Sequence, residues 1–167
     1  MKIFIIGNLA STMINFRKEF IKMLVSSEHE VYCLASDYDK KSREKISSFG
    51  AIPLDYTLNA KGLNPFKDVI ATFNLIRLFR QYRPDVVFSF FVKPVIFATI
   101  AAKIARVPRL VGMIEGLGGA FTVHKSGQTK KAKIIKIIQI FLYKLSLPLL
   151  DEIIFLTTDD KKELIDT

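Results

Sequence analysis

The sequence Glu115-Gly116-Leu117-Gly118-Gly119 places a carboxylate beside three glycines, directly after an apolar segment. Glycines let the backbone approach a ligand closely. The Glu115 carboxylate could accept hydrogen bonds from sugar hydroxyls or act as a general base. A flexible turn with an exposed acid is the alternative explanation. We favour a binding or catalytic site that includes Gly116 and Gly118, because a glycine-rich turn at a strand end is conformationally costly.

Glu115 is also the only acid in a strongly basic part of the chain. Residues 86–150 contain ten Lys and Arg and one acid, so they account for the whole net charge of +9. The remaining residues contain fifteen charges of each sign. A basic and apolar region with one carboxylate suggests a site for a polyanionic substrate near a membrane surface.

The segment 7–17 is a second candidate binding region. Asn8, Ser11 and Asn15 offer hydrogen-bonding groups, and Arg17 can bind a phosphate or carboxylate through two parallel hydrogen bonds. The segment has one glycine where a dinucleotide-binding fingerprint needs three. An ordinary polar loop that caps a helix explains the segment equally well.

Two further cations lie near expected helix starts. Lys61 and Asn64 precede Pro65, where free backbone N–H groups could bind an anion, although a turn followed by a cap is the simpler explanation. Lys93 follows a strand and precedes a helix, so we expect it to point into the mouth of a cleft. A solvated surface lysine is the alternative.

A basic, apolar helix is expected over residues 130–147. Lys130, Lys133, Lys136 and Lys144 fall within an arc of roughly 120°, and isoleucines, leucines and Phe fill most of the rest. A core helix with a solvated lysine face explains part of this pattern. The wide apolar coverage favours a helix that lies in a membrane interface, where each basic group near an anionic leaflet contributes about 1 kcal/mol.

These residues must be positioned by alternating strands and helices. Strands are expected at 2–6, 30–34, 51–54, 86–90, 109–113 and 152–156, and helices at 14–25, 40–49, 65–82, 95–106 and 130–147, with a last helical turn from 158. This alternation predicts an α/β fold with one doubly wound, Rossmann-like parallel sheet. Ligands bind beyond the carboxyl ends of such strands. The 65–82 helix has one apolar side, made of Phe66, Val69, Ile70, Phe73, Ile76 and Phe79.

Several functional classes are disfavoured. The single cysteine, Cys33, excludes an internal disulfide and reads as a buried structural thiol. His29 and His124 have no ligand-like neighbours, so we expect no metal and no other cofactor. No nucleic-acid motif accompanies the basic charge, so nucleic acid is not an expected partner. No apolar run is long enough to cross a bilayer, although the chain is expected to touch one.

The same residues resemble family 4 glycosyltransferases of the GT-B fold. The resemblance is greatest to bacterial enzymes that add N-acetylhexosamine to sugars carried on undecaprenyl diphosphate. The matching segments are 1–7, 15–17, 63–66, 93–94, 101–103, 107–108, 115–118, 142–146 and 154–155. The Glu-Gly-Leu-Gly turn at 115–118, together with Leu-Tyr-Lys-Leu-Ser at 142–146, is the most specific part.

The resemblance implies a retaining, metal-independent enzyme with two domains. The N-terminal domain binds the acceptor and docks on the membrane, and the C-terminal domain binds the nucleotide-sugar. Residues 1–167 match only the first domain, so we expect the donor domain to be absent and the chain to be inactive alone. By position, Arg17 and Lys93 are expected near an acceptor diphosphate. Asn15, Asn64 and Glu115 are expected around the acceptor sugar.

The expected partners follow from this resemblance. They are a lipid-linked saccharide acceptor, an anionic membrane surface and, if the enzyme is split, a separate chain that carries the donor domain. The expected location is cytoplasmic and peripheral, at the inner face of the cytoplasmic membrane. A membrane-surface binding module without enzymatic activity is the alternative.

Overall fold

A computed structural model describes residues 1–58, 65–117, 121 and 129–165. Its centre is a six-stranded parallel sheet with the strand order β3-β2-β1-β4-β5-β6. The strands are β1 (Lys2–Ile6), β2 (Glu30–Ala35), β3 (Ile52–Asp55), β4 (Val86–Phe90), β5 (Arg109–Ile114) and β6 (Glu152–Phe155). This order confirms the doubly wound, Rossmann-like fold predicted from the sequence.

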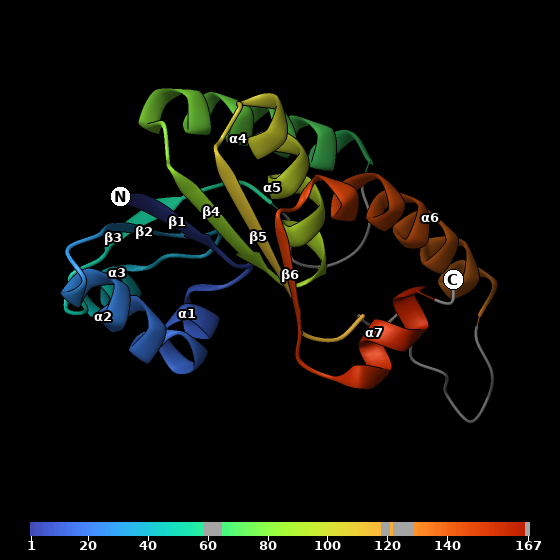
Figure 1. Cartoon of the computed structure of the whole chain (residues 1–167), viewed down its shortest axis with the longest axis horizontal. Helices are drawn as coiled ribbons and strands as arrows, with labels where there is room; N and C mark the ends of the chain where they lie inside the picture. Colours follow the sequence, from blue (N-terminus) through green and yellow to red (C-terminus); the bar gives the residue numbers. More distant parts are fainter. Residues whose placement is uncertain (59–64, 118–120, 122–128, 166–167) are drawn as a thin grey trace.

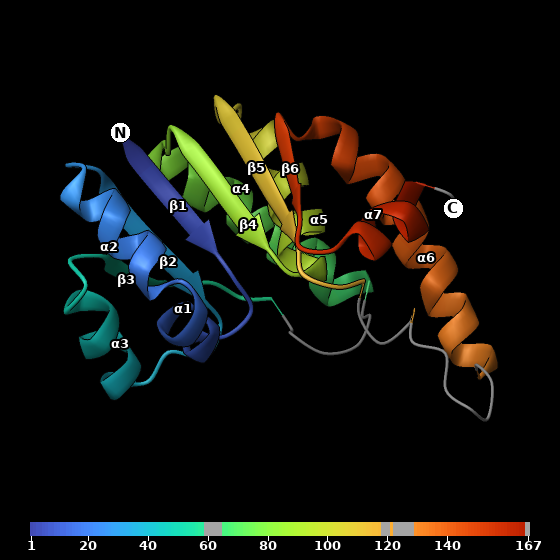
Figure 2. The same cartoon turned by 60° about the horizontal axis from the view of Figure 1, so that its bottom comes forward.

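Helices cover both faces of the sheet (Figures 1 and 2). One face carries α1 (Ala10–Phe16), α2 (Lys18–Ser26) and α3 (Lys40–Ser47), and the other carries α4 (Pro65–Tyr82), α5 (Val92–Ile104) and α6 (Lys130–Ser146). A short 3-10 helix, η1 (Leu147–Leu149), leads into β6, and α7 (Thr158–Ile165) follows it. The two helical layers define two hydrophobic clusters, one on each face of the sheet.

Helix α5 is the most buried helix among those described. It packs against β4, β5, α4 and α6, and its buried positions include Ala98, Ala101 and Ala102. Small side chains let neighbouring helices approach closely, so α4 and α6 both rest on α5 instead of on the sheet alone.

The single helix expected over residues 14–25 is wrong, because the chain forms two helices that meet at Arg17. Arg17 ends α1 and begins α2 with φ −119° and ψ 2°, outside the helical region. Apolar side chains of this segment pack on the core: Ile21 is fully buried, and Ile14, Phe20, Leu24 and Val25 are partly buried against it. The break turns Arg17 away from solvent and toward the carboxyl end of the sheet.

The apolar side of α4 is not its buried side along the first half of the helix. Phe66, Val69, Ile70 and Phe73 are 52–83% exposed, whereas the later Ile76 and Phe79 are buried. The buried stripe is instead Asp68, Ala71, Leu75, Ile76 and Phe79. An ion pair made by Asp68, described below, accounts for this rotation of the helix.

The two edges of the sheet differ in chemistry. Strand β3 carries Pro53, which has no N–H to donate, and ends at Asp55. Strand β6 carries Ile153 and Ile154, which are partly exposed on opposite faces of the strand. Within the described residues, β6 pairs only with β5.

Gly7, at the end of β1, lies against the ring of Phe90, and a Cβ atom added at Gly7 would overlap that ring. Phe90 is fully buried, so the ring has little room to move. We expect Gly7→Ala to lower the free energy of unfolding by about 1–3 kcal/mol, as overpacking of cores does. In urea denaturation, the double variant Gly7→Ala/Phe90→Leu should lose less than the sum of the single losses. Strictly additive losses would contradict this account.

Candidate functional site

The candidate site lies at the carboxyl ends of β1, β4 and β5, which are neighbours in the sheet. Arg17, at the break between α1 and α2, forms an ion pair with Glu115, which follows β5. Their side chains are only 12% and 11% exposed. The two residues that the sequence singled out in separate segments therefore meet, and the fold positions them through the break at Arg17.

The guanidinium of Arg17 is held on several sides. It stacks on the ring of Phe90, 4.6 Å from the ring centroid, and donates to the backbone oxygen of Phe16 at 3.0 Å. It also lies 3.5 Å from the sulfur of Met113. Its Nε atom is buried and has no hydrogen-bond partner among the residues that the structure describes. Burial lowers the pKa of Arg17 from its usual value, but a guanidinium in a protein keeps its charge.

This pairing narrows the role of Glu115. A carboxylate that pairs with a guanidinium is a hydrogen-bond acceptor, so the pairing favours a binding role for Glu115. Gly116 follows with φ +90°, and among the described residues a Cβ atom added there would meet nothing within 4 Å. On the side of these residues the backbone beside Glu115 is thus open to a ligand. The predicted residue Gly118 lies outside the described residues.

Helix α6 contacts the same turn through Gln139. The sequence analysis did not predict this contact. The side-chain nitrogen of Gln139 donates a 2.6 Å hydrogen bond to the backbone oxygen of Leu117. Lys136 lies 4.4 Å from the ring centroid of Phe121. A buried amide in an otherwise apolar helix was the available signal, because such a group needs a partner. These contacts join the turn after β5 to a helix at the surface.

The sequence analysis expected Lys93 to point into the mouth of a cleft. The structure instead buries its side chain on the other face of the sheet. Its Nζ lies 2.7 Å from Oδ1 of Asp68, and the two side chains are 8% and 3% exposed. The pair joins the first turns of α4 and α5. Lys93 therefore does not share a hollow with Arg17 and Glu115, and Asp68 is a partner that the sequence analysis missed.

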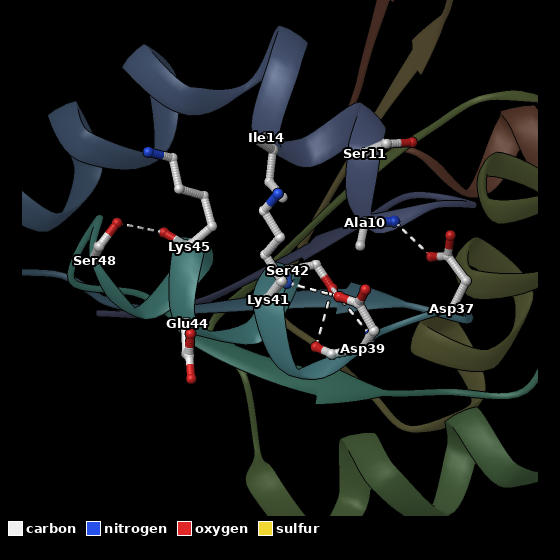
Figure 3. Close-up of a pocket in the computed structure, with 10 residues that line it drawn as sticks. All are labelled: Ala10, Ser11, Ile14, Asp37, Asp39, Lys41, Ser42, Glu44, Lys45 and Ser48. Carbon is white, nitrogen blue, oxygen red and sulfur yellow. Dashed lines mark hydrogen bonds between the residues drawn. The ribbon is translucent and has the colours of Figure 1, made fainter.

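The other predicted residues of segment 7–17 do not gather into one site. Asn8 is half-buried, and its Oδ1 has no hydrogen-bond partner. Asn15 is exposed on α1. Ser11 lines a groove of about 640 Å³ between α1 and α3, apart from the Arg17–Glu115 pair (Figure 3).

Most residues that line the groove are polar, and two of them, Asp37 and Asp39, bond to backbone N–H groups nearby. Asp37 accepts a 2.6 Å hydrogen bond from the Ala10 N–H, and Asp39 caps α3. Lys61 and Asn64, which were also predicted to bind the acceptor, lie outside the described residues.

The predicted membrane-facing residues of α6 are placed differently from one another. Lys133 and Lys144 are exposed, Lys136 is half-buried, and the side chain of Lys130 lies outside the described residues. Between them, α6 exposes five large apolar side chains that are 40–67% exposed: Ile134, Ile137, Ile138, Phe141 and Leu145. The prediction of a wide apolar face on this helix is confirmed.

Three other features concern the cysteine, metal binding and membrane crossing. Cys33 is buried, and burial raises its pKa to about 12, so the thiol stays protonated. Within the described parts of the chain, no three His, Cys, Asp or Glu side chains gather closely enough to hold a metal ion. None of the helices in those parts is long and apolar enough to cross a membrane.

Comparison with known proteins relates this arrangement to sugar-transferring enzymes. Residues 2–157 match the model of a family described as glycosyl transferase 4-like. A curated relative from Campylobacter jejuni, N,N'-diacetylbacillosaminyl-diphospho-undecaprenol alpha-1,3-N-acetylgalactosaminyltransferase, is 27% identical over 155 residues. The match covers 93% of this chain and 40% of the relative.

Solved structures show the same fold at low sequence identity. MurG of Acinetobacter baumannii is 15% identical with a TM-score of 0.60, over 95% of this chain and 42% of MurG. A glycosyltransferase of Rickettsia africae and a putative UDP-N-acetylglucosamine 2-epimerase of Listeria monocytogenes are each 14% identical with TM-scores of 0.65. Each covers 99% of this chain, which corresponds to 39% and 42% of their own lengths. The chain thus spans less than half of the proteins that it matches.

The buried pair of Lys93 and Asp68 makes a testable contribution to stability. Removing one partner leaves an uncompensated charge, so we expect Lys93→Met or Asp68→Asn to lower the free energy of unfolding by about 3–5 kcal/mol. The double variant Lys93→Met/Asp68→Leu should recover most of that loss. Arg43→Gln is the control, because its pair with Asp55 is exposed and should contribute less than about 1 kcal/mol. A double variant as unstable as the single variants would argue against the pair.

Proposed function

Because the chain belongs to the glycosyl transferase 4-like family, we propose that it is the acceptor-binding part of a glycosyltransferase. The family match confirms the resemblance noted from the sequence. The reaction would transfer a sugar from a nucleotide-sugar to a saccharide carried on a lipid diphosphate. The observation that carries this proposal is the meeting of Arg17, Glu115 and the open backbone at Gly116, where a parallel sheet binds its ligands.

In this proposal Arg17 and Glu115 bind different parts of the acceptor. Arg17 binds the diphosphate, because a guanidinium matches phosphate oxygens and is already held in place by Phe90 and Phe16. Glu115 orients Arg17 and accepts hydrogen bonds from sugar hydroxyls. Lys93 stays outside this arrangement unless α4 moves, because Asp68 already neutralises it.

The donor half would come from polypeptide outside residues 1–167. The chain corresponds to 40% of the Campylobacter relative, and the described sheet provides one ligand-binding edge. The missing half could be fused to this one in a longer protein or belong to a separate chain. We propose that transfer retains the configuration of the sugar, uses no metal and does not occur with residues 1–167 alone.

The outer faces of α6 and α4 suggest how the chain reaches a lipid-linked acceptor. Exposed apolar side chains on both helices stand beside basic residues, which suits the headgroup region of an anionic bilayer. Gln139 connects α6 directly to the turn that carries Glu115. We propose a peripheral location at the inner face of the cytoplasmic membrane. A membrane-surface module without enzymatic activity is the second candidate, and these same faces favour it.

Acceptor binding tests the main proposal. A suitable probe is N-acetylglucosamine linked to farnesyl diphosphate, measured by isothermal titration with the purified chain. We expect Arg17→Gln to weaken binding by about 10- to 100-fold, the usual effect of losing hydrogen bonds to a charged group. Arg43→Gln, an exposed arginine of α3, should leave the affinity unchanged. If the unaltered chain ignores the probe, or Arg17→Gln binds it equally well, the acceptor site is not here.

Membrane docking is tested by sedimentation with vesicles. We expect the chain to bind vesicles that contain phosphatidylglycerol, and to bind them less as salt rises. Ile137→Glu in α6 should reduce binding about tenfold, because it places a charge in the apolar face. Met23→Glu is the control, since Met23 is also an exposed apolar residue (53%, against 67% for Ile137) but belongs to α2, on the opposite face of the sheet. Equal effects of both substitutions would refute docking through α6.

A further inference from the structure

Four described residues other than glycine adopt a positive φ: Glu28 at 59°, Arg83 at 49°, Phe91 at 69° and Arg106 at 62°. Three of them, Glu28, Arg83 and Arg106, follow the last turns of α2, α4 and α5. Their N–H groups bond back to carbonyl oxygens of those helices. Helices often end in this left-handed way, so these three residues need no functional explanation.

Phe91 differs from the other three in position and in conformation. It lies between the end of β4 and the start of α5, at the edge of the sheet where the candidate site is found. Its φ of 69° is combined with a ψ of 160°, a region that is essentially confined to glycine. Its side chain is bulky and has no polar atom to cap α5, and its backbone oxygen accepts a 3.0 Å hydrogen bond from the Val95 N–H. Such strain persists only where the surrounding structure imposes it.

The strained conformation places two aromatic rings side by side. Residues that follow each other along a strand normally point to opposite faces of the sheet. Phe90 and Phe91 both join the cluster on the face of α1 and α2 instead, with their ring centroids 5.0 Å apart. Phe90 in turn carries the guanidinium of Arg17, which pairs with Glu115. The side chains of Phe91, Phe90, Arg17 and Glu115 thus contact one another in that order.

We propose that Phe91 determines sugar specificity, as the apolar platform on which the first sugar of the acceptor rests. This inference depends on the proposed function and names one further residue for it. A sugar ring has an apolar C–H face and a rim of hydroxyl groups. Phe91 offers a surface for that face, and Glu115 offers oxygens to the rim. Arg17 and Glu115 already pair with each other, but a sugar hydroxyl can also accept from the buried Nε of Arg17, which a prenyl chain cannot do, so the neighbouring groups fit a sugar better than a lipid.

The test compares two probes: N-acetylglucosamine linked to farnesyl diphosphate, and farnesyl diphosphate without a sugar. Phe91→Gly relieves the strained backbone and removes the ring. We expect it to bind the sugar-bearing probe about tenfold more weakly, within the range of aromatic stacking, and the sugar-free probe with unchanged affinity. Its melting temperature should not fall, because strain relief offsets the lost contact of a ring that is already half-exposed.

Three further variants serve as controls. Phe91→Tyr keeps the flat ring and should keep the affinity for the sugar-bearing probe. Phe91→Leu keeps apolar bulk without a flat face and should lose that affinity, so it tests the proposal even if the glycine variant folds poorly. Arg83→Gly relieves a positive φ far from the site and should change binding of neither probe.

The outcomes separate the two ideas. If the unaltered chain binds neither probe, the proposed function fails, and this inference fails with it. If the chain binds both probes and Phe91→Gly and Phe91→Leu still prefer the sugar-bearing one, Phe91 has no role in specificity and only the inference is overturned. If both variants lose stability and bind both probes equally less well, Phe91 serves the fold and the inference is again overturned.

Discussion

The ring of Phe90 is the constraint on which the carboxyl end of the sheet depends. On one side it lies so close to the backbone after β1 that a side chain at position 7 would overlap it, and on another it supports the guanidinium of Arg17. Arg17 can reach that position only because the chain breaks between α1 and α2. One buried aromatic residue in a central strand therefore connects the packing of the core with the geometry of the proposed acceptor site.

Two buried ion pairs occur near this edge, one on each face of the sheet, and they have different consequences. Buried pairs seldom stabilise a fold more than apolar residues would, because both charges lose their hydration. Lys93 and Asp68 join two helices and set which side of α4 faces outward. Arg17 and Glu115 lie beside open backbone at Gly116. An anionic ligand at that site would share Arg17 with Glu115, so the pair holds the cation in position before the ligand arrives.

Much of the fold could be predicted from local patterns. Apolar runs located every strand of the described sheet, and the helix that starts at Pro65 has the bounds that the sequence indicated. The orientation of that helix could not be predicted, because it depends on Asp68 meeting Lys93, and nothing in the apolar periodicity identifies such a partner. The spacing of Asp68, Ala71, Leu75 and Phe79 in a buried stripe was the only available signal.

The candidate site shows the same limit. The turn at Glu115 and the cation at Arg17 were recognisable by residue type, whereas their pairing depends on the order of strands and on the break between α1 and α2. The positive φ of Phe91 had no local signal at all, because a sequence offers glycine, and not phenylalanine, as the marker of such a conformation. Gln139 was visible only as a polar residue in an apolar helix.

The two edge strands of the described sheet differ in how well they could pair with another strand. At β3, Pro53 interrupts the row of donors and Asp55 ends it with a charge, so an incoming strand would find an incomplete ladder. At β6, no proline interrupts the row, and aliphatic side chains flank it above and below. The described edge at β6 therefore offers a more complete row of donors and acceptors than the edge at β3.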